Sequence, residues 1–124
     1  MGKKIIIKFG EREVIAELNE SMSAELLYKT LPANLSMTRW GDEFYGNCGV
    51  PVDQEKDSRT DMEIGELALW PEGSALCIFF GPTPVSRGDK PKAISPVNPI
   101  GRIVGDIGFL KKFPSSIDIE IRPA

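Results

Sequence analysis

The hexapeptide Trp40–Tyr45 brings aromatic rings and two carboxylates together around a glycine, and no other stretch of the chain concentrates so much chemistry. In one interpretation, Trp40 and Tyr45 wall a groove in which Glu43 binds a cation or a peptide N–H. In the other, Trp40 and Phe44 pack inward while the two carboxylates cap a tight turn. We favour the second, because buried aromatic rings dominate small cores.

A second unusual stretch, Phe79–Pro84, pairs two phenylalanines with a loop that contains two prolines. Adjacent residues on a strand face opposite ways, so either Phe79 or Phe80 enters the core and the other lies outward, in a groove or beneath the loop. A rigid corner is the favoured interpretation, and a preformed ligand wall is the alternative. Together the two stretches give the candidate ligand-binding residues Arg39, Trp40, Glu43, Phe44, Tyr45, Asn47, Phe79 and Phe80.

The chain has no histidine and two cysteines, which limits the chemistry that it can perform. Histidine is the commonest general base near neutral pH and the commonest metal ligand. A structural zinc site needs about four Cys or His ligands, so we expect no metal and no cofactor. Cys48 is expected in a loop without a base to activate it, and Cys77 is expected as an inert core thiol. The alternating acids at Asp53, Glu55 and Asp57 lack the glycine and glutamate of a calcium loop, which indicates a solvated charge run.

Charge and length exclude several classes of protein. The 15 basic and 18 acidic residues leave a net charge of −3, without the basic patch that nucleic-acid binding requires. No stretch approaches the roughly 20 apolar residues of a membrane helix, and the first apolar run is too short for a signal peptide. We therefore expect a single domain over residues 1–124, cytoplasmic, with no nucleic-acid or membrane partner.

The elements that would position these residues are mostly short strands. Alternation of apolar and polar residues predicts a hairpin from Lys3 to Leu18 with its turn at Gly10-Glu11. A helix is expected near residues 22–31, stopped by Pro32, and a helical turn near 108–112. Further strands are expected at two segments of Leu35–Tyr45, Val50–Val52, Ile64–Leu69, Ala75–Phe80, Val97–Val104 and Ser116–Arg122. This pattern favours a β-barrel or sandwich in which the first and last strands pair and so remove two open edges.

Three segments of the chain resemble the cyclophilins: Ile64–Leu69 is similar to their G-x-L-x-M stretch, Gly73–Ile78 to G-S-Q-F-F-I, and Val97–Ile103 to H-V-V-F-G-K-V. The segments Trp40–Tyr45, Trp70–Gly73 and Phe79–Pro84 resemble a family of short bacterial and archaeal cyclophilin-like proteins of undetermined function. The resemblance implies a mainly β fold, a closed eight-stranded barrel with a helix across one open end.

The prolyl isomerase pocket of cyclophilins carries over poorly. Their histidine corresponds to Val97, their glutamine to Ala75, and their phenylalanine pair to Leu76 and Cys77. One similarity remains, because Arg39 keeps the spacing to Phe44 and Asn47 that the catalytic arginine has to its neighbours. Arg39 is therefore a weak catalytic candidate.

Three functions stay open. The first is a non-catalytic module that binds a small apolar ligand or an extended peptide near Arg39–Tyr45 and Phe79–Pro84. The second is a prolyl isomerase with a rebuilt pocket. The third is a structural domain that forms homo-oligomers through apolar residues around the Pro-rich loop at residues 81–92.

Overall fold

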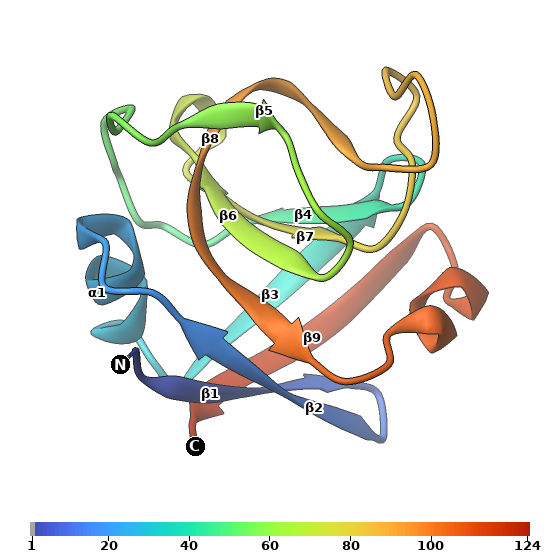
Figure 1. Cartoon of the computed structure of the whole chain (residues 1–124). Coiled ribbons are helices and arrows are strands. Elements are labelled where there is room, and N and C mark those ends of the chain that lie inside the picture. Colours follow the sequence, from blue (N-terminus) through green and yellow to red (C-terminus); the bar gives the residue numbers. More distant parts are fainter. Residues whose placement is uncertain (1) are drawn as a thin grey trace.

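The computed structural model describes residues 2–124 and is mainly β (Figure 1). Its strands are β1 (Lys4–Phe9), β2 (Arg12–Leu18), β3 (Ala33–Arg39), β4 (Glu43–Asn47), β5 (Arg59–Asp61), β6 (Glu66–Trp70), β7 (Ala75–Phe79), β8 (Lys92–Val104) and β9 (Ser116–Pro123). Its helical segments are α1 (Met22–Tyr28) and two 3₁₀ turns, η1 (Pro71–Gly73) and η2 (Gly108–Lys112). The helical turn expected near 108–112 is thus confirmed.

Eight of the strands pair in a closed ring. The order is β2-β1-β9-β3-β4-β7-β6-β8, and the pairing of β2 with β8 joins the two ends. The ninth strand, β5, pairs with β8 outside the ring. The ring confirms the fold expected from the resemblance. The first and last strands pair, as the strand pattern predicted, and their pairing is antiparallel.

The β1–β2 hairpin shows why the ring has a dry interior. Ile5, Ile7 and Phe9 alternate with polar or half-buried residues and are all buried. Gly10 occupies the tight turn with φ of 62°, a conformation that favours glycine. The alternation of apolar and polar residues that predicted the hairpin therefore identifies the strand face that packs inside the ring.

The helix α1 is shorter than predicted. Ser21 caps its start by accepting a hydrogen bond from the Ala24 N–H, and Leu27 packs against the interior of the ring. The prediction that it continues to Leu31 is wrong. The backbone N–H and the side-chain hydroxyl of Thr30 both donate to the Leu27 carbonyl, three residues back, so the chain leaves the α-helical pattern there. Met22, at the start of the helix, is 70% exposed.

Two strand predictions need correction on either side of β5. No strand forms at Val50–Val52; Val50 is buried in the core without a strand partner. The strand of this region is β5, at Arg59–Asp61. β8 begins at Lys92 rather than Val97, because its first residues pair with β5: Lys92 lies opposite Asp61 and Val97 opposite Arg59.

The loop before β5 is fastened by Asn98 of β8, which is fully buried. Its side-chain amide donates to Ser23 Oγ at 3.1 Å and to the Asp53 carbonyl at 2.8 Å, and its oxygen accepts from the Glu55 N–H at 2.9 Å. Glu55 in turn accepts hydrogen bonds from the backbone and hydroxyl of Ser23. The prediction of a merely solvated charge run is wrong at Glu55, which ties the loop to α1.

Apolar side chains form two clusters. The inner core fills the ring and includes Phe44 and Phe80, whose rings stack at 5.3 Å. The outer cluster lies on the outer face of β4, β7 and β6, beneath β5 and the start of β8, and consists of Met62, Ala68, Cys77, Phe79, Ala93 and Val97. The prediction that Phe79 and Phe80 face opposite ways is confirmed.

Among the described residues, no helix has the length and apolar composition that a membrane crossing would require.

Candidate ligand pocket

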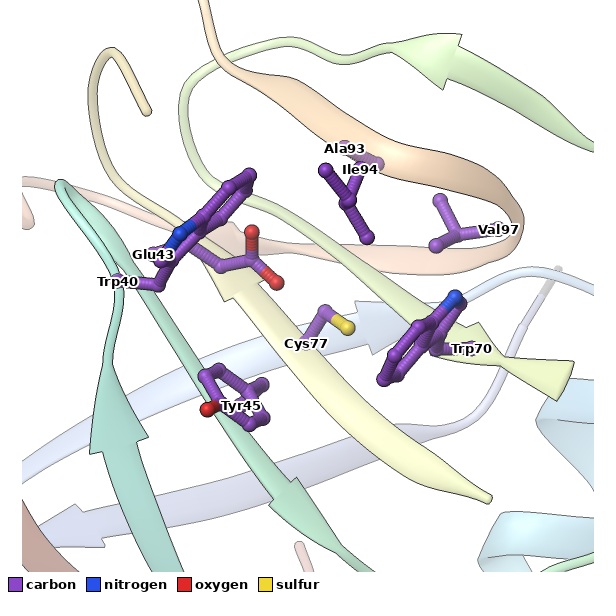
Figure 2. A pocket seen from close by; sticks show the side chains of 8 residues that line it. All are labelled: Trp40, Glu43, Tyr45, Trp70, Cys77, Ala93, Ile94 and Val97. Carbon is purple, nitrogen blue, oxygen red and sulfur yellow. The ribbon is translucent and has the colours of Figure 1, made fainter. Parts of the chain in front are cut away.

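A pocket of about 230 Å³ opens beside the outer cluster, on the outer face of the ring (Figure 2). It is lined by Trp40, Glu43, Tyr45, Trp70, Cys77, Ala93, Ile94 and Val97. The lining comes from the turn before β4, from β4, β7 and β6, and from the start of β8.

Strand alternation places the floor of the pocket. On β4, Glu43 and Tyr45 face outward, whereas Phe44 between them enters the inner core. Cys77 of β7 lies opposite Tyr45 on one side and opposite Ala68 of β6 on the other. The Cys77 thiol therefore lies at the middle of the floor, flanked by both neighbouring strands.

Two indole rings form opposite walls. Trp40 and Trp70 stand on either side of the Glu43 carboxyl and the Cys77 thiol (Figure 2). The Trp70 ring is fixed from two directions, because its Nε1 donates to Ser95 Oγ at 2.7 Å and its face covers Gly73 so closely that a Cβ there would lie 2.6 Å from the ring. The wall on this side is thus preformed.

The Trp40 wall depends on the turn that follows it. Gly41 has φ of 61°, and a Cβ at this position would lie 2.7 Å from the Pro84 ring and 2.9 Å from the Thr83 backbone. Trp40 exchanges backbone hydrogen bonds with Glu43 across the turn. The Pro-rich loop therefore supports the turn from behind, which connects the two stretches that the sequence singles out.

Glu43 is the chemically unusual residue of the pocket. Its side chain is 5% exposed, and its Oε1 has no hydrogen-bond partner among the described residues. Burial raises the pKa of this carboxyl from 4.5 to about 7, and a hydrogen bond from the Cys77 thiol opposes the shift. Near neutral pH the carboxyl therefore exists in both its protonated and its ionised forms.

The Cys77 thiol is held in its neutral form. Burial raises its pKa well above 9, and the Glu43 carboxyl raises it further by charge and by accepting the thiol hydrogen. The prediction of an inert core thiol agrees with this environment, since Cys77 is 2% exposed. The core cluster to which it belongs is the outer one, and it also lines the pocket.

The pocket collects only part of the predicted set. Trp40, Glu43 and Tyr45 line it, so the favoured inward packing of Trp40 is wrong, as is the expectation that the Glu43 carboxylate caps the turn. Phe44 and Phe80 are in the inner core, and Phe79 is buried in the outer cluster.

Arg39 and Asn47 are engaged elsewhere. The Arg39 guanidinium donates to Asp42 Oδ1 at 2.7 Å and to the carbonyls of Gly41, Lys111 and Phe113 at 2.7, 3.1 and 3.0 Å. Asn47 donates to the Gly73 carbonyl at 3.2 Å and accepts from the Gly49 N–H at 3.1 Å. Neither is among the residues that line the pocket.

Sequence reasoning missed five lining residues: Trp70, Cys77, Ala93, Ile94 and Val97. One signal was available for Cys77, because it lies two residues before Phe79 and so shares the face of that ring. The residues of β8 carried no such signal, since their strand was expected to begin only at Val97.

Comparisons with known proteins agree with this architecture. The chain matches the model of the family described as cyclophilin-like over residues 3–122. It is also similar to the solution structure of a hypothetical protein from Archaeoglobus fulgidus, with 35% sequence identity, a TM-score of 0.83, and coverage of 99% of this chain and 95% of that one. A search of curated proteins found no match. The ring of strands, the sequence match over nearly its whole length and the archaeal structure together show that this chain belongs to the cyclophilin-like family.

Proposed function

We propose that this protein is a non-catalytic binding module whose pocket takes a small, largely apolar ligand. The observation that carries the proposal is the unpartnered Oε1 of Glu43 beside an apolar hollow. A buried polar atom without a hydrogen bond costs free energy, and a ligand group that bonds to it recovers that cost. Ligand sites characteristically combine apolar walls with few polar groups.

The size of the pocket limits the ligand. A volume of about 230 Å³ is below the range of roughly 300–1,000 Å³ that is typical of drug-sized ligands. It suits a small molecule, or one side chain of an extended peptide. We favour the small molecule, because the preformed Trp70 wall and the single free carboxyl oxygen offer a compact set of contacts.

The position of Arg39 supports a non-catalytic role over prolyl isomerisation. An arginine that polarises a prolyl bond needs donors free to face the substrate. The donors of Arg39 are directed at three carbonyls and a carboxylate of its own chain, outside the pocket lining. The Cys77 thiol offers no substitute nucleophile, because its raised pKa leaves little thiolate near neutral pH.

The test uses tryptophan fluorescence, since the chain has two tryptophans and both line the pocket. Neutral apolar fragments are titrated into the protein, and we expect saturable changes in emission. Ile94→Ala should weaken binding, whereas Ile64→Ala should not, because Ile64 is similarly exposed (54% against 59%) but lies outside the pocket lining. Fragments that produce no saturable change, or equal effects of both substitutions, would contradict the proposal.

A further inference from the structure

The composition of the pocket lining limits the chemical classes of ligand that the pocket can accept. Trp40, Tyr45 and Trp70 contribute aromatic rings, and Glu43 is the one side chain of the lining, among the described residues, that can carry a full charge near neutral pH. The lining includes no Lys or Arg. An anionic ligand would therefore meet a carboxyl without a counter-charge, which disfavours carboxylates and phosphates.

A cation meets complementary groups in the same space. The faces of aromatic rings attract positive charge, tryptophan most strongly, and the attraction grows when the site is shielded from water. The two indoles stand on opposite sides of the Glu43 carboxyl (Figure 2), so a cation beside the carboxyl would have an aromatic wall on either side. The carboxyl supplies the counter-charge, and its Oε1 is not engaged by another described residue.

The number of N–H groups on the cation matters as well. A primary ammonium carries three donors and needs three acceptors when it leaves water. The pocket presents the free oxygen of Glu43 and the weakly accepting sulfur of Cys77 between the indoles. A fully alkylated ammonium carries no N–H donor to satisfy, and its methyl groups pack against Ile94, Val97 and the aromatic rings.

We propose that the ligand of this pocket is a small alkylated ammonium ion, held between Trp40 and Trp70 with the Glu43 carboxylate as its counter-charge. This inference rests on the proposed binding function and names the chemical class of the ligand.

The protonation of Glu43 gives the inference a distinctive signature. Among the described residues, two titratable groups face the Glu43 carboxyl: the Cys77 thiol of β7, which is hydrogen-bonded to it, and Tyr45, which lines the pocket from the same strand as Glu43. The part of β8 that lines the pocket, Ala93–Val97, carries no charged side chain. Arg39, at the end of β3, and Asp42, in the turn before β4, form an ion pair with each other. Because the empty carboxyl titrates near pH 7, a bound cation must displace its proton, and affinity should rise between pH 6 and pH 8.

The experiment compares choline with 3,3-dimethylbutan-1-ol, which has the same shape without the charge. Each is titrated at pH 6 and pH 8, at constant ionic strength, with tryptophan emission as the readout. We expect choline to bind about tenfold more tightly than the alcohol at pH 8, and to lose most of that advantage at pH 6. Glu43→Gln should remove the advantage of choline over the alcohol at pH 8, while Glu72→Gln, at an exposed carboxylate outside the pocket, should behave as wild type.

Equal affinity for the two probes, tighter binding of the alcohol, or an affinity for choline that falls between pH 6 and pH 8 would overturn the inference while leaving the proposed binding function intact. Saturable binding of neither probe would overturn it too, and the neutral fragment titration then decides the binding function separately. If Glu43→Gln does not fold, the two probes at two pH values on the wild-type protein still decide the question.

Discussion

The Cys77 thiol donates a hydrogen bond to the carboxyl of Glu43 on the adjacent strand, and the two side chains are 2% and 5% exposed. Burial raises the pKa of both groups, so the pair is most stable when both are neutral. Most proteins keep glutamate in water or paired with a cation. Here the strand register and the cover provided by β8 hold a carboxyl in an apolar hollow, which costs stability once the carboxyl ionises.

The first prediction concerns the pH dependence of stability. The Glu43 carboxyl has a pKa of about 7 in the folded protein and 4.5 as a model group. Above pH 4.5 the unfolded chain loses this proton while the folded protein retains it, so the Glu43 contribution to stability is complete below pH 4.5 and is lost as pH rises to about 7. The expected loss is about 3 kcal/mol.

Urea denaturation of wild type and Glu43→Gln at pH 4.5, 6 and 8 measures this contribution. The glutamine variant should gain on wild type as pH rises, with the gain complete near pH 8. Glu72→Gln, at an exposed position, should follow the wild-type profile throughout. Parallel profiles for wild type and Glu43→Gln would show that the carboxyl titrates normally.

The second prediction concerns the two thiols. Cys48 is half-buried and Cys77 is buried, and burial raises the pKa of both. We expect a thiol reagent to modify Cys48 slowly in the folded protein and Cys77 only on unfolding, because the thiolate is the reactive form. In Cys48→Ser, the folded protein should therefore show almost no reaction over hours, followed by one equivalent in denaturant. Prompt modification of that variant while it is folded would mean that Cys77 is accessible from the pocket in its reactive form.

How much the sequence predicted can be traced to particular residues. The ring of strands was predictable, because Ile5, Ile7, Phe9 and the isoleucines of β9 alternate with polar residues and so mark the inner face. The pocket was only half predictable. Its walls are built on the outer face, where Cys77 and Ala93 look like ordinary core residues in the sequence. Only the pairing of β5 with the start of β8 shows that a second apolar layer exists outside the ring.

The hexapeptide Trp40–Tyr45 illustrates the same limit. Both interpretations considered for it put aromatic rings in apolar surroundings, and each was right for part of it: Phe44 enters the core, whereas Trp40 and Tyr45 line the pocket with Glu43. Local alternation separates Phe44 from Tyr45. It does not place Trp40, which precedes the turn and depends on the contact of Gly41 with Thr83 and Pro84, more than 40 residues along the chain.

The third prediction assigns Arg39 a structural role. Its guanidinium joins the end of β3 to the carbonyls of Lys111 and Phe113, beside η2, and covers the Phe80 ring at 5.1 Å. Arg39→Ala should lower the free energy of unfolding by about 2–3 kcal/mol, since it leaves these carbonyls and Asp42 without their donor. Arg39→Lys should recover less than half of the loss, because an ammonium cannot reproduce the planar fork of donors.

An isomerisation assay on an Xaa-Pro peptide separates this role from catalysis. Wild type and Arg39→Ala should both leave the peptide at its uncatalysed rate, measured where both variants are folded. Clear wild-type activity that disappears in Arg39→Ala would instead support the isomerase hypothesis.

The last prediction concerns Asn98, whose fully buried amide holds the loop before β5 against α1. Asn98→Ala removes three hydrogen bonds and leaves the Asp53 carbonyl and the Glu55 N–H without their partner. We expect the free energy of unfolding to fall by about 3 kcal/mol, because unsatisfied polar groups cost more than the average hydrogen bond contributes. Asn34→Ala, at an exposed position on β3, should change the free energy of unfolding by less than about 0.5 kcal/mol.

Hydrogen exchange of the backbone amides at residues 53–58 adds a local measurement. Their protection should drop in Asn98→Ala even in conditions where the ring of strands remains folded, because the hydrogen bonds of Asn98 and Ser23 anchor this loop. Unchanged protection would show that the hydrogen bonds of Ser23 to Glu55 and the burial of Val50 hold the loop without Asn98.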